Sequence, residues 1–454
     1  MKRLIFFLLI NFSFLLFCEE NWWNENWQYR IKIKIKNPTE NSLQDIPVII
    51  NGETLRKKTG LLKENISTNS IRIIDEKNNE IPCQVDEKDN TGLYQKTGNG
   101  QLDKDDEIVF QISLNPNEEK KLFIYFREKL SPLPEYPSDL QFKKVVFGDM
   151  GINYNAELSN SIISIGIRGS GTEKDNQGKL ILGGLGKASI TSFKIKDKQL
   201  IYQGHSWGWN LGGGGYTPIS NSLPWDNPEI LIDGSVRKIA FCKAENVDRN
   251  FNEEFKDIAW VLSGKIKGSY YRYFILYSKI PYCEMKENIK IESAEPRYNC
   301  LYEFSWCPTY PRDWDNDKLY IPLAGKAITI NFQDQRNYKT KKAEEGWLAI
   351  ANTKEKRGLS LFFDKDNTED IFADFYGVGV KREDVLSNEW NKKYSHTGVR
   401  VFYRYNDFNL RQIRENKFGF WGITDEDAEK IRAIYKSIWE GLPISFGFPE
   451  EKQK

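Results

Sequence analysis

Alternation of hydrophobic and polar residues is the dominant pattern of this chain. In the segment 29–36, Ile31, Ile33 and Ile35 alternate with arginine and lysine, which predicts a strand with one buried and one solvated face. Similar short runs follow at 46–50, 70–75, 80–85, 107–114 and 120–126, with turn-forming residues between them. Six short strands within roughly a hundred residues predict a small β-sandwich or barrel.

A second series of strand-like runs begins near residue 142 and shows almost no helical periodicity. The runs cover 161–167, 180–185, 189–195, 236–242, 258–266, 270–276, 286–291, 327–332, 346–351 and 398–405. Such a series suits a large antiparallel two-sheet sandwich. Three prolines in the segment 130–137 predict a linker between the two parts.

One helix is predicted near the end of the chain. Thr424 is its expected cap, with Asp427 three positions later, and Gly441 followed by Pro443 ends it. Its apolar stripe consists of Ala428, Ile431, Tyr435, Ile438 and Trp439.

Two stretches of the sequence resemble known families. The segments 71–87 and 105–126 resemble the N-terminal β-domain of families akin to the exo-rhamnogalacturonan lyases. The pair 345–353 and 357–363 resembles strands of galactose-mutarotase-like supersandwich domains. These motifs are structural, so the resemblance implies a fold and no catalytic residue.

Pattern and resemblance together predict an all-β fold: a small N-terminal β-sandwich or barrel, a large antiparallel β-supersandwich and one C-terminal helix. The expected divisions are a signal peptide at 1–18, a first domain at 19–129, a linker at 130–137, a large domain at 138–422, and the helix with its tail at 423–454.

The first residues predict export. Lys2 and Arg3 precede an apolar run, Leu4 to Phe17, that is typical of a secretory signal peptide. Cys18 follows a sequence that resembles the lipobox of bacterial lipoproteins, although Phe17 stands where a small residue is usual. Lipid attachment at Cys18 and simple cleavage both remain open, and both predict a secreted or cell-envelope protein outside the cytoplasmic membrane.

Net charge and cysteine content limit the classes of partner and cofactor that the sequence predicts. The net charge of +1 provides no field to attract nucleic acid, and membrane contact is expected only through an N-terminal lipid. Cysteine spacing matches no zinc pattern, so no metal site and no cofactor are predicted. A surface calcium ion at Asp313–Asp317, or at Asp103, Asp105 and Asp106, competes with solvated acidic turns at both places.

The segment 201–237 holds the densest group of aromatic and ionisable residues. On a strand, His205, Trp207 and Trp209 would stand in a row on one face. Aromatic rings in a cleft stack on sugars, so the predicted substrate-binding residues are Trp207, Trp209, Trp225 and Glu229. The competing interpretation is an interior strand whose tryptophans fill the sandwich core.

A lyase that acts on uronic acids needs a base and a cation that neutralises the substrate carboxylate. The candidates are His205 or Tyr216 as the base and Arg237 as the cation, with Arg272 and Arg297 as alternatives. A glycosidase needs two carboxylates, for which 64 acidic residues supply too many candidates to choose between.

The sequence therefore predicts an exported protein that binds or processes a polysaccharide. If it is an enzyme, it is a carbohydrate-active lyase or hydrolase. The alternative is a non-enzymatic structural or assembly protein of the surface or envelope, whose aromatic residues form the core.

Overall fold

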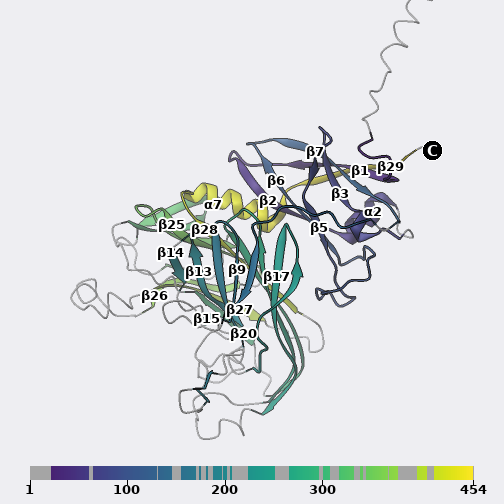
Figure 1. Cartoon of the computed structure of the whole chain (residues 1–454). Coiled ribbons are helices and arrows are strands. Elements are labelled where there is room, and N and C mark those ends of the chain that lie inside the picture. Colours follow the sequence, from purple (N-terminus) through teal and green to yellow (C-terminus); the bar gives the residue numbers. More distant parts are fainter. Residues whose placement is uncertain are drawn as a thin grey trace, which may run out of the picture.

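A computed structural model describes most of the chain and shows a mainly antiparallel β-protein (Figure 1). The described residues are 22–60, 65–129, 131–145, 155–169, 173–174, 180–181, 188–196, 198–201, 205–206, 223–250, 265–295, 300–306, 316–331, 338–340, 344–366, 368–376, 396–405 and 414–452.

The N-terminal domain is a small sandwich of two sheets, as predicted. Its larger sheet has the order β29-β1-β7-β3-β4 and its smaller sheet the order β2-β6-β5. Ile31, Ile33 and Ile35 are fully buried between the sheets, so the alternation in the sequence places the inward face correctly. The bounds are β1 (Tyr29–Lys36), β2 (Leu43–Asn51), β3 (Arg72–Asp75), β4 (Glu80–Ile81), β5 (Cys83–Asp86), β6 (Glu107–Leu114) and β7 (Glu119–Phe126).

Two short helical segments in this domain were not predicted. The helix α2 (Gly52–Thr59) ends at Gly60, whose φ of 69° is the left-handed conformation that glycine adopts readily. The other is a single 3-10 turn, η1 (Thr68–Ser70).

The last strand of the chain, β29 (Ile444–Glu451), belongs to the sheet of the first domain. It pairs antiparallel with β1, from Tyr29 opposite Glu451 to Ile35 opposite Ile444. The sequence analysis assigned this segment to a tail after the helix, whereas the structure places it at the edge of the N-terminal sheet (Figure 1). The first and last described segments therefore lie side by side.

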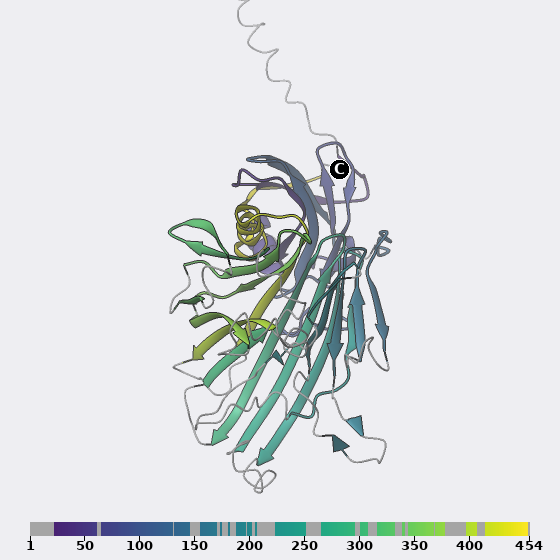
Figure 2. The same ribbon diagram turned by 90° about the vertical axis from the view of Figure 1, so that its left-hand side faces the viewer.

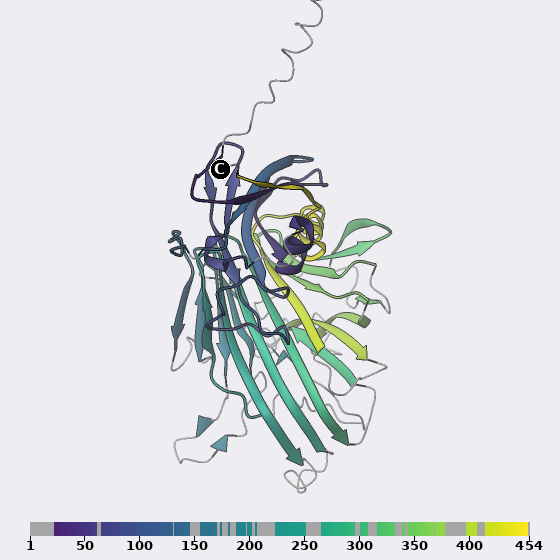
Figure 3. The same ribbon diagram turned by 90° about the vertical axis from the view of Figure 1, so that its right-hand side faces the viewer.

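The large domain is built on a sheet with the order β16-β17-β18-β19-β28-β25-β24-β21-β22 in the described part of the chain. Its bounds are β16 (Glu229–Asp233), β17 (Arg237–Asn250), β18 (Lys265–Tyr277), β19 (Tyr282–Glu295), β28 (Arg414–Ile423), β25 (Arg357–Phe363), β24 (Trp347–Asn352), β21 (Asp317–Leu323) and β22 (Lys326–Asn331). The long strands β17, β18 and β19 run together away from the N-terminal domain (Figures 2 and 3).

One face of this sheet packs against a second sheet with the order β14-β13-β10-β9-β8. Fully buried residues such as Ile165, Phe193, Phe274 and Leu361 fill the space between the two sheets. This sandwich confirms the predicted large antiparallel β-domain. The second sheet consists of β8 (Gln141–Lys144), β9 (Ala156–Ser159), β10 (Ile163–Arg168), β13 (Ser189–Ile195) and β14 (Lys198–Ile201).

Two further sheets complete the strands of the large domain. One has the order β15-β20-β27-β26-β23 and the other pairs β11 with β12. Their bounds are β15 (His205–Ser206), β20 (Cys300–Trp306), β27 (His396–Tyr405), β26 (Thr368–Tyr376), β23 (Tyr338–Thr340), β11 (Glu173–Lys174) and β12 (Leu180–Ile181).

The opposite face of the large sheet is covered by the N-terminal domain and by the C-terminal helix. The helix α7 (Ala428–Tyr435) continues as a π-helical turn, η3 (Lys436–Gly441), and packs on β21, β22 and β24. Asp427 caps the helix by accepting a 2.8 Å hydrogen bond from the Lys430 amide. The predicted cap, Thr424, is wrong by three residues.

In the described part of the chain, no helix is both long enough and apolar enough to cross a membrane.

Candidate functional site

The structure describes only part of the predicted site. Trp207, Trp209 and Tyr216 lie outside the described residues, as does Cys18. The backbone of His205 is described in β15, where it pairs with Ser305 of β20. The predicted roles of these residues remain predictions.

Trp225 is a core residue in this structure. Its side chain is 2% exposed and belongs to the cluster between the two sheets of the large domain. The ring lies edge-on to Tyr270 at 6.3 Å, and the Arg272 guanidinium lies 5.1 Å from the ring centre. For this tryptophan, the geometry corresponds to the interior-strand interpretation.

Arg237 lies at the junction of the two domains and is 0% exposed. Its Nε donates to Asp86 Oδ2 at 2.6 Å, and its Nη2 donates to Glu107 Oε2. A third nitrogen, Nη1, donates to the Tyr277 hydroxyl at 3.2 Å. The guanidinium that the sequence analysis assigned to a substrate carboxylate is thus bonded to two carboxylates of the N-terminal domain.

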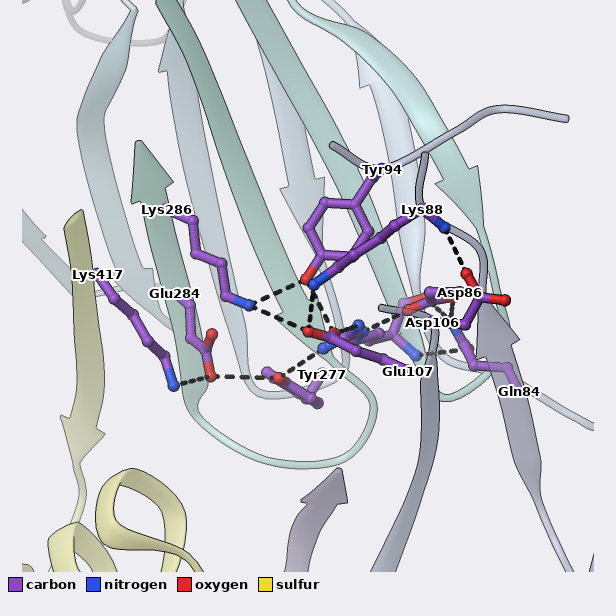
Figure 4. Close-up of polar contacts among 11 residues, drawn as sticks. Gln84, Asp86, Lys88, Tyr94, Asp106, Glu107, Tyr277, Glu284, Lys286 and Lys417 are labelled. Carbon is purple, nitrogen blue, oxygen red and sulfur yellow. Dashed lines mark hydrogen bonds and ion pairs between the residues drawn. The ribbon is translucent and has the colours of Figure 1, made fainter. Parts of the chain in front are cut away.

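We call the surrounding group the interdomain ionic cluster (Figure 4). Its members are Asp86, Lys88, Tyr94 and Glu107 of the N-terminal domain and Arg237, Tyr277, Glu284, Lys286 and Lys417 of the large sheet.

Lys286 and Glu107 connect the two halves of the cluster. Lys286 Nζ donates to the Tyr94 hydroxyl at 3.0 Å and lies 3.6 Å from Glu107 Oε1. Lys88 Nζ approaches the same carboxylate oxygen to 2.7 Å. Gln84 adds two bonds to the backbone, because its Oε1 accepts from the amides of residues 236 and 237 at 2.9 and 3.0 Å.

Opposite charges favour the ionised forms of Glu107 and Lys286. Burial alone would raise the pKa of Glu107, but the charges of Lys286, Arg237 and Lys88 hold that pKa well below its usual range. Burial would lower the pKa of Lys286, and the charge of Glu107 instead raises it well above its usual range. Burial raises the pKa of Asp86, and the charge of Arg237 opposes that shift. The bonds of Arg237 to Asp86 and Glu107 join the two domains through this cluster.

Next to the cluster, the same sheet face carries three aromatic side chains that we call the aromatic strip: Phe241, Tyr271 and Tyr273. The rings of Phe241 and Tyr273 are parallel, with centroids 6.4 Å apart and an interplanar angle of 19°. Tyr94 lies edge-on to Tyr273 at 5.2 Å, so the cluster supports the strip from the side. Phe241 and Tyr271 are half-buried and therefore reach solvent.

Polar residues border the aromatic strip. Glu229 of β16 is exposed and lies opposite Phe241, while Asn288 of β19 lies between Tyr271 and Glu415. Residues directly opposite each other in antiparallel strands share one face of the sheet, so these groups surround the rings. Glu229 is the predicted substrate-binding residue that the structure brings to this face.

The sequence analysis did not select the aromatic strip. The sequence pattern that could have indicated it is the run Tyr270–Tyr277, in which Tyr271, Tyr273 and Tyr277 share one face of the strand. Which face would remain accessible depends on how the N-terminal domain packs, and a strand pattern alone does not contain that information.

No group of three or more histidine, cysteine, aspartate or glutamate side chains is placed to hold a metal ion in the described part of the chain. At the predicted acidic turn, Asp106 accepts hydrogen bonds from the amides of Lys88 and Asp103 at 2.7 and 2.6 Å, and burial raises its pKa to about 6. Asp313 of the other candidate lies outside the described residues.

No protein-family model matches the sequence, and no curated protein matches it. Among solved structures, a protein in the glycosyl hydrolase family 38 from Enterococcus faecalis is similar over 96% of this chain and 49% of its own, with 9% identity and a TM-score of 0.47. This chain thus spans about half the length of that protein.

Two smaller proteins are similar over more of their own length. A galactose mutarotase related enzyme from Lactobacillus acidophilus is covered over 98% of its length and 60% of this chain, with 10% identity and a TM-score of 0.34. A putative aldose 1-epimerase from Klebsiella pneumoniae is covered over 87% of its length and 66% of this chain, with 8% identity and a TM-score of 0.36. At these identities, the likeness concerns the fold alone.

Proposed function

We propose that this protein is exported and binds or processes a polysaccharide, and that the aromatic strip belongs to its binding surface. The observation that carries the proposal is the placement of half-buried rings beside exposed polar groups on one sheet face. The apolar face of a sugar ring packs well on an aromatic ring, while its hydroxyls donate to carboxylate and amide oxygens.

The dimensions and rigidity of the strip suit an extended ligand. From Glu229 on β16 to the neighbourhood of Glu415 on β28, the sheet advances by four strand spacings, or about 19 Å. Regular strands and the ionic cluster beside them hold the rings in place before a ligand arrives, which lowers the entropy cost of binding.

The binding proposal is tested by affinity electrophoresis of the mature protein in gels that contain single polysaccharides. We expect Phe241→Ala and Tyr271→Ala each to weaken the retaining interaction about tenfold, equivalent to about 1.4 kcal/mol. Phe448→Ala is the matched control, because Phe448 is 91% exposed but lies on β29 in the other domain.

Two results would contradict the binding proposal. In one, the wild-type protein is retained by none of the polysaccharides. In the other, both strip variants are retained like the wild type while their circular dichroism shows that they are folded.

Export and lipid attachment form a separate part of the proposal. A signal peptide at 1–18 is expected to be absent from the mature protein, and lipid on Cys18 would be detected by incorporation of a labelled fatty acid. Cys18→Ser should abolish the label. A chain found in the cytoplasm with residues 1–18 still attached would refute export.

Processing, as distinct from binding, rests on the sequence-based candidates His205 and Tyr216. Incubation with uronic-acid polymers, followed by absorbance of the unsaturated product, separates a lyase from a binder. If such a product forms, His205→Gln and Tyr216→Phe should each reduce its rate.

The alternative is a non-enzymatic structural or assembly protein of the envelope. It is favoured by a specific observation: Arg237 and Trp225, both candidates from the sequence, are buried and bonded within the protein. Failure of every polysaccharide to retain the wild-type protein would support this alternative.

A further inference from the structure

The cations on the face of the aromatic strip are mostly committed to partners inside the protein. Arg237 is bonded to Asp86 and Glu107, and Lys286 to Glu107 and Tyr94. Closer to the rings, Lys243 Nζ forms a 2.6 Å ion pair with Glu245. Arg237 and Lys286 are therefore neutralised by buried protein carboxylates, and Lys243 is paired at the surface.

Arg272 is equally committed on the other face of the sheet. It is 0% exposed and its Nε donates to Glu287 at 2.8 Å. Of the arginines that the sequence analysis considered for a uronic acid, Arg237 and Arg272 are thus both buried in ion pairs.

The uncommitted polar groups beside the strip are acceptors. Glu229 and Glu415 are exposed and carry no hydrogen bond or ion pair with the described residues. Asn288 is 4% exposed, and its Oδ1 is buried without a hydrogen-bond partner among the described residues. An unsatisfied buried acceptor is costly, so a ligand that donates to it recovers the lost bond.

Asn288 lies between the ring of Tyr271 and the carboxylate of Glu415 in the sheet. It lies directly opposite Tyr271 on β18 and Glu415 on β28, so its amide is on the face of the aromatic strip. Lys290, two positions further along β19, is exposed and has no ion pair with the described residues, but it lies on the side of Asn288 that is remote from Phe241.

From these paired cations and unpaired acceptors, we infer that the aromatic strip selects glycans that lack carboxylates. The hydroxyl or amine groups of such glycans donate to Glu229, Asn288 and Glu415. This inference rests on the proposed function and specifies the ligand of the same surface. Two exposed carboxylates, among described cations of which Arg237, Lys286 and Lys243 are already paired, repel a uronate and favour donors, most strongly an ammonium group.

The test compares three soluble polymers in affinity electrophoresis: a neutral galactomannan, the amine-bearing chitosan and polygalacturonate. We expect the wild-type protein to bind galactomannan or chitosan at least tenfold more tightly than polygalacturonate. Rising salt should weaken binding of chitosan more than binding of galactomannan.

Variants locate the selectivity. Asn288→Asp preserves the shape of the side chain and adds a negative charge, so it should tighten binding of chitosan and weaken binding of polygalacturonate. Glu415→Gln should weaken binding of chitosan about tenfold. Lys290→Ala is the control and should leave the affinity for each polymer within about twofold, which corresponds to about 0.4 kcal/mol.

The outcomes separate this inference from the proposed function. If polygalacturonate binds as tightly as the other polymers and Tyr271→Ala abolishes that binding, the strip binds glycans but the inferred selectivity is wrong. A tenfold loss in Lys290→Ala would also overturn it. If no polymer binds, the proposed function fails and the inference fails with it.

Discussion

Replacing Arg237 with methionine provides the sharpest test of the interdomain ionic cluster. The side chain is fully buried, and its loss leaves Asp86 with hydrogen bonding from Gln84 as its remaining described support. Glu107 keeps Lys286 and Lys88, so the uncompensated charge is chiefly that of Asp86.

The expected magnitude follows from that geometry. Removing one partner of a buried ion pair costs about 3–5 kcal/mol, a large part of the about 5–15 kcal/mol by which proteins are stable. Removing the orphaned charge as well, in Arg237→Met with Asp86→Asn, should recover about 0.5–3 kcal/mol through coupling between the two sites.

The assay is urea unfolding at pH 7, followed by tryptophan fluorescence and circular dichroism. Lys57→Met is the control, because it removes the surface ion pair with Glu53 and should leave the unfolding midpoint unchanged. Unaltered stability of Arg237→Met would refute the reasoning about the cluster. Unaltered stability together with lost polysaccharide binding would instead restore Arg237 as a ligand-binding residue.

Three further predictions concern the pH dependence, the thiols and the last strand. Because the pKa of Glu107 is lower in the folded protein than in the unfolded chain, the stability it contributes is present above about pH 4.5 and lost as the pH falls toward the folded value. Urea unfolding at pH 5 and pH 3.5 should therefore differ less in Glu107→Gln than in the wild type, and an equal difference would contradict this. Cys83, Cys242 and Cys283 are buried, which raises their thiol pKa values, to about 11 for Cys83, so peptide mapping after alkylation at pH 8 should find them unmodified until the protein is unfolded. Deleting 444–454 should speed amide hydrogen exchange in β1, and protection equal to the wild type would show that β29 does not hold that strand.

Local patterns predicted the strands well where one face is buried and the other is wet. The alternation at 29–36 gave β1 with its inward residues, and the predicted segment 107–114 coincides with β6. The helix at the C-terminus was found from its apolar stripe, but Asp427 replaced Thr424 as its cap because the first turn begins later than the pattern suggested.

The interdomain ionic cluster and the aromatic strip were much harder to predict from the sequence. Glu107 and Arg237 are 130 residues apart, and their meeting depends on how one domain packs on the other. The sequence analysis assigned Arg237 to a ligand's carboxylate, because sequence alone does not distinguish such a group from the carboxylates of Asp86 and Glu107, to which the side chain is bonded. Phe241 was overlooked because β17 has hydrophobic residues on both of its faces, so its pattern does not show which face is buried.

The pairing of β29 with β1 has a consequence for biosynthesis. Between Lys36 and Ile444 a ribosome must add roughly 400 residues, which at about 5–20 residues per second takes about 20–80 s. For that time β1 lacks its final neighbour and offers an open edge to other nascent chains. Conditions that delay folding until the whole polypeptide is available would shield this edge, and a tag fused after residue 454 would follow a strand that lies beside β1.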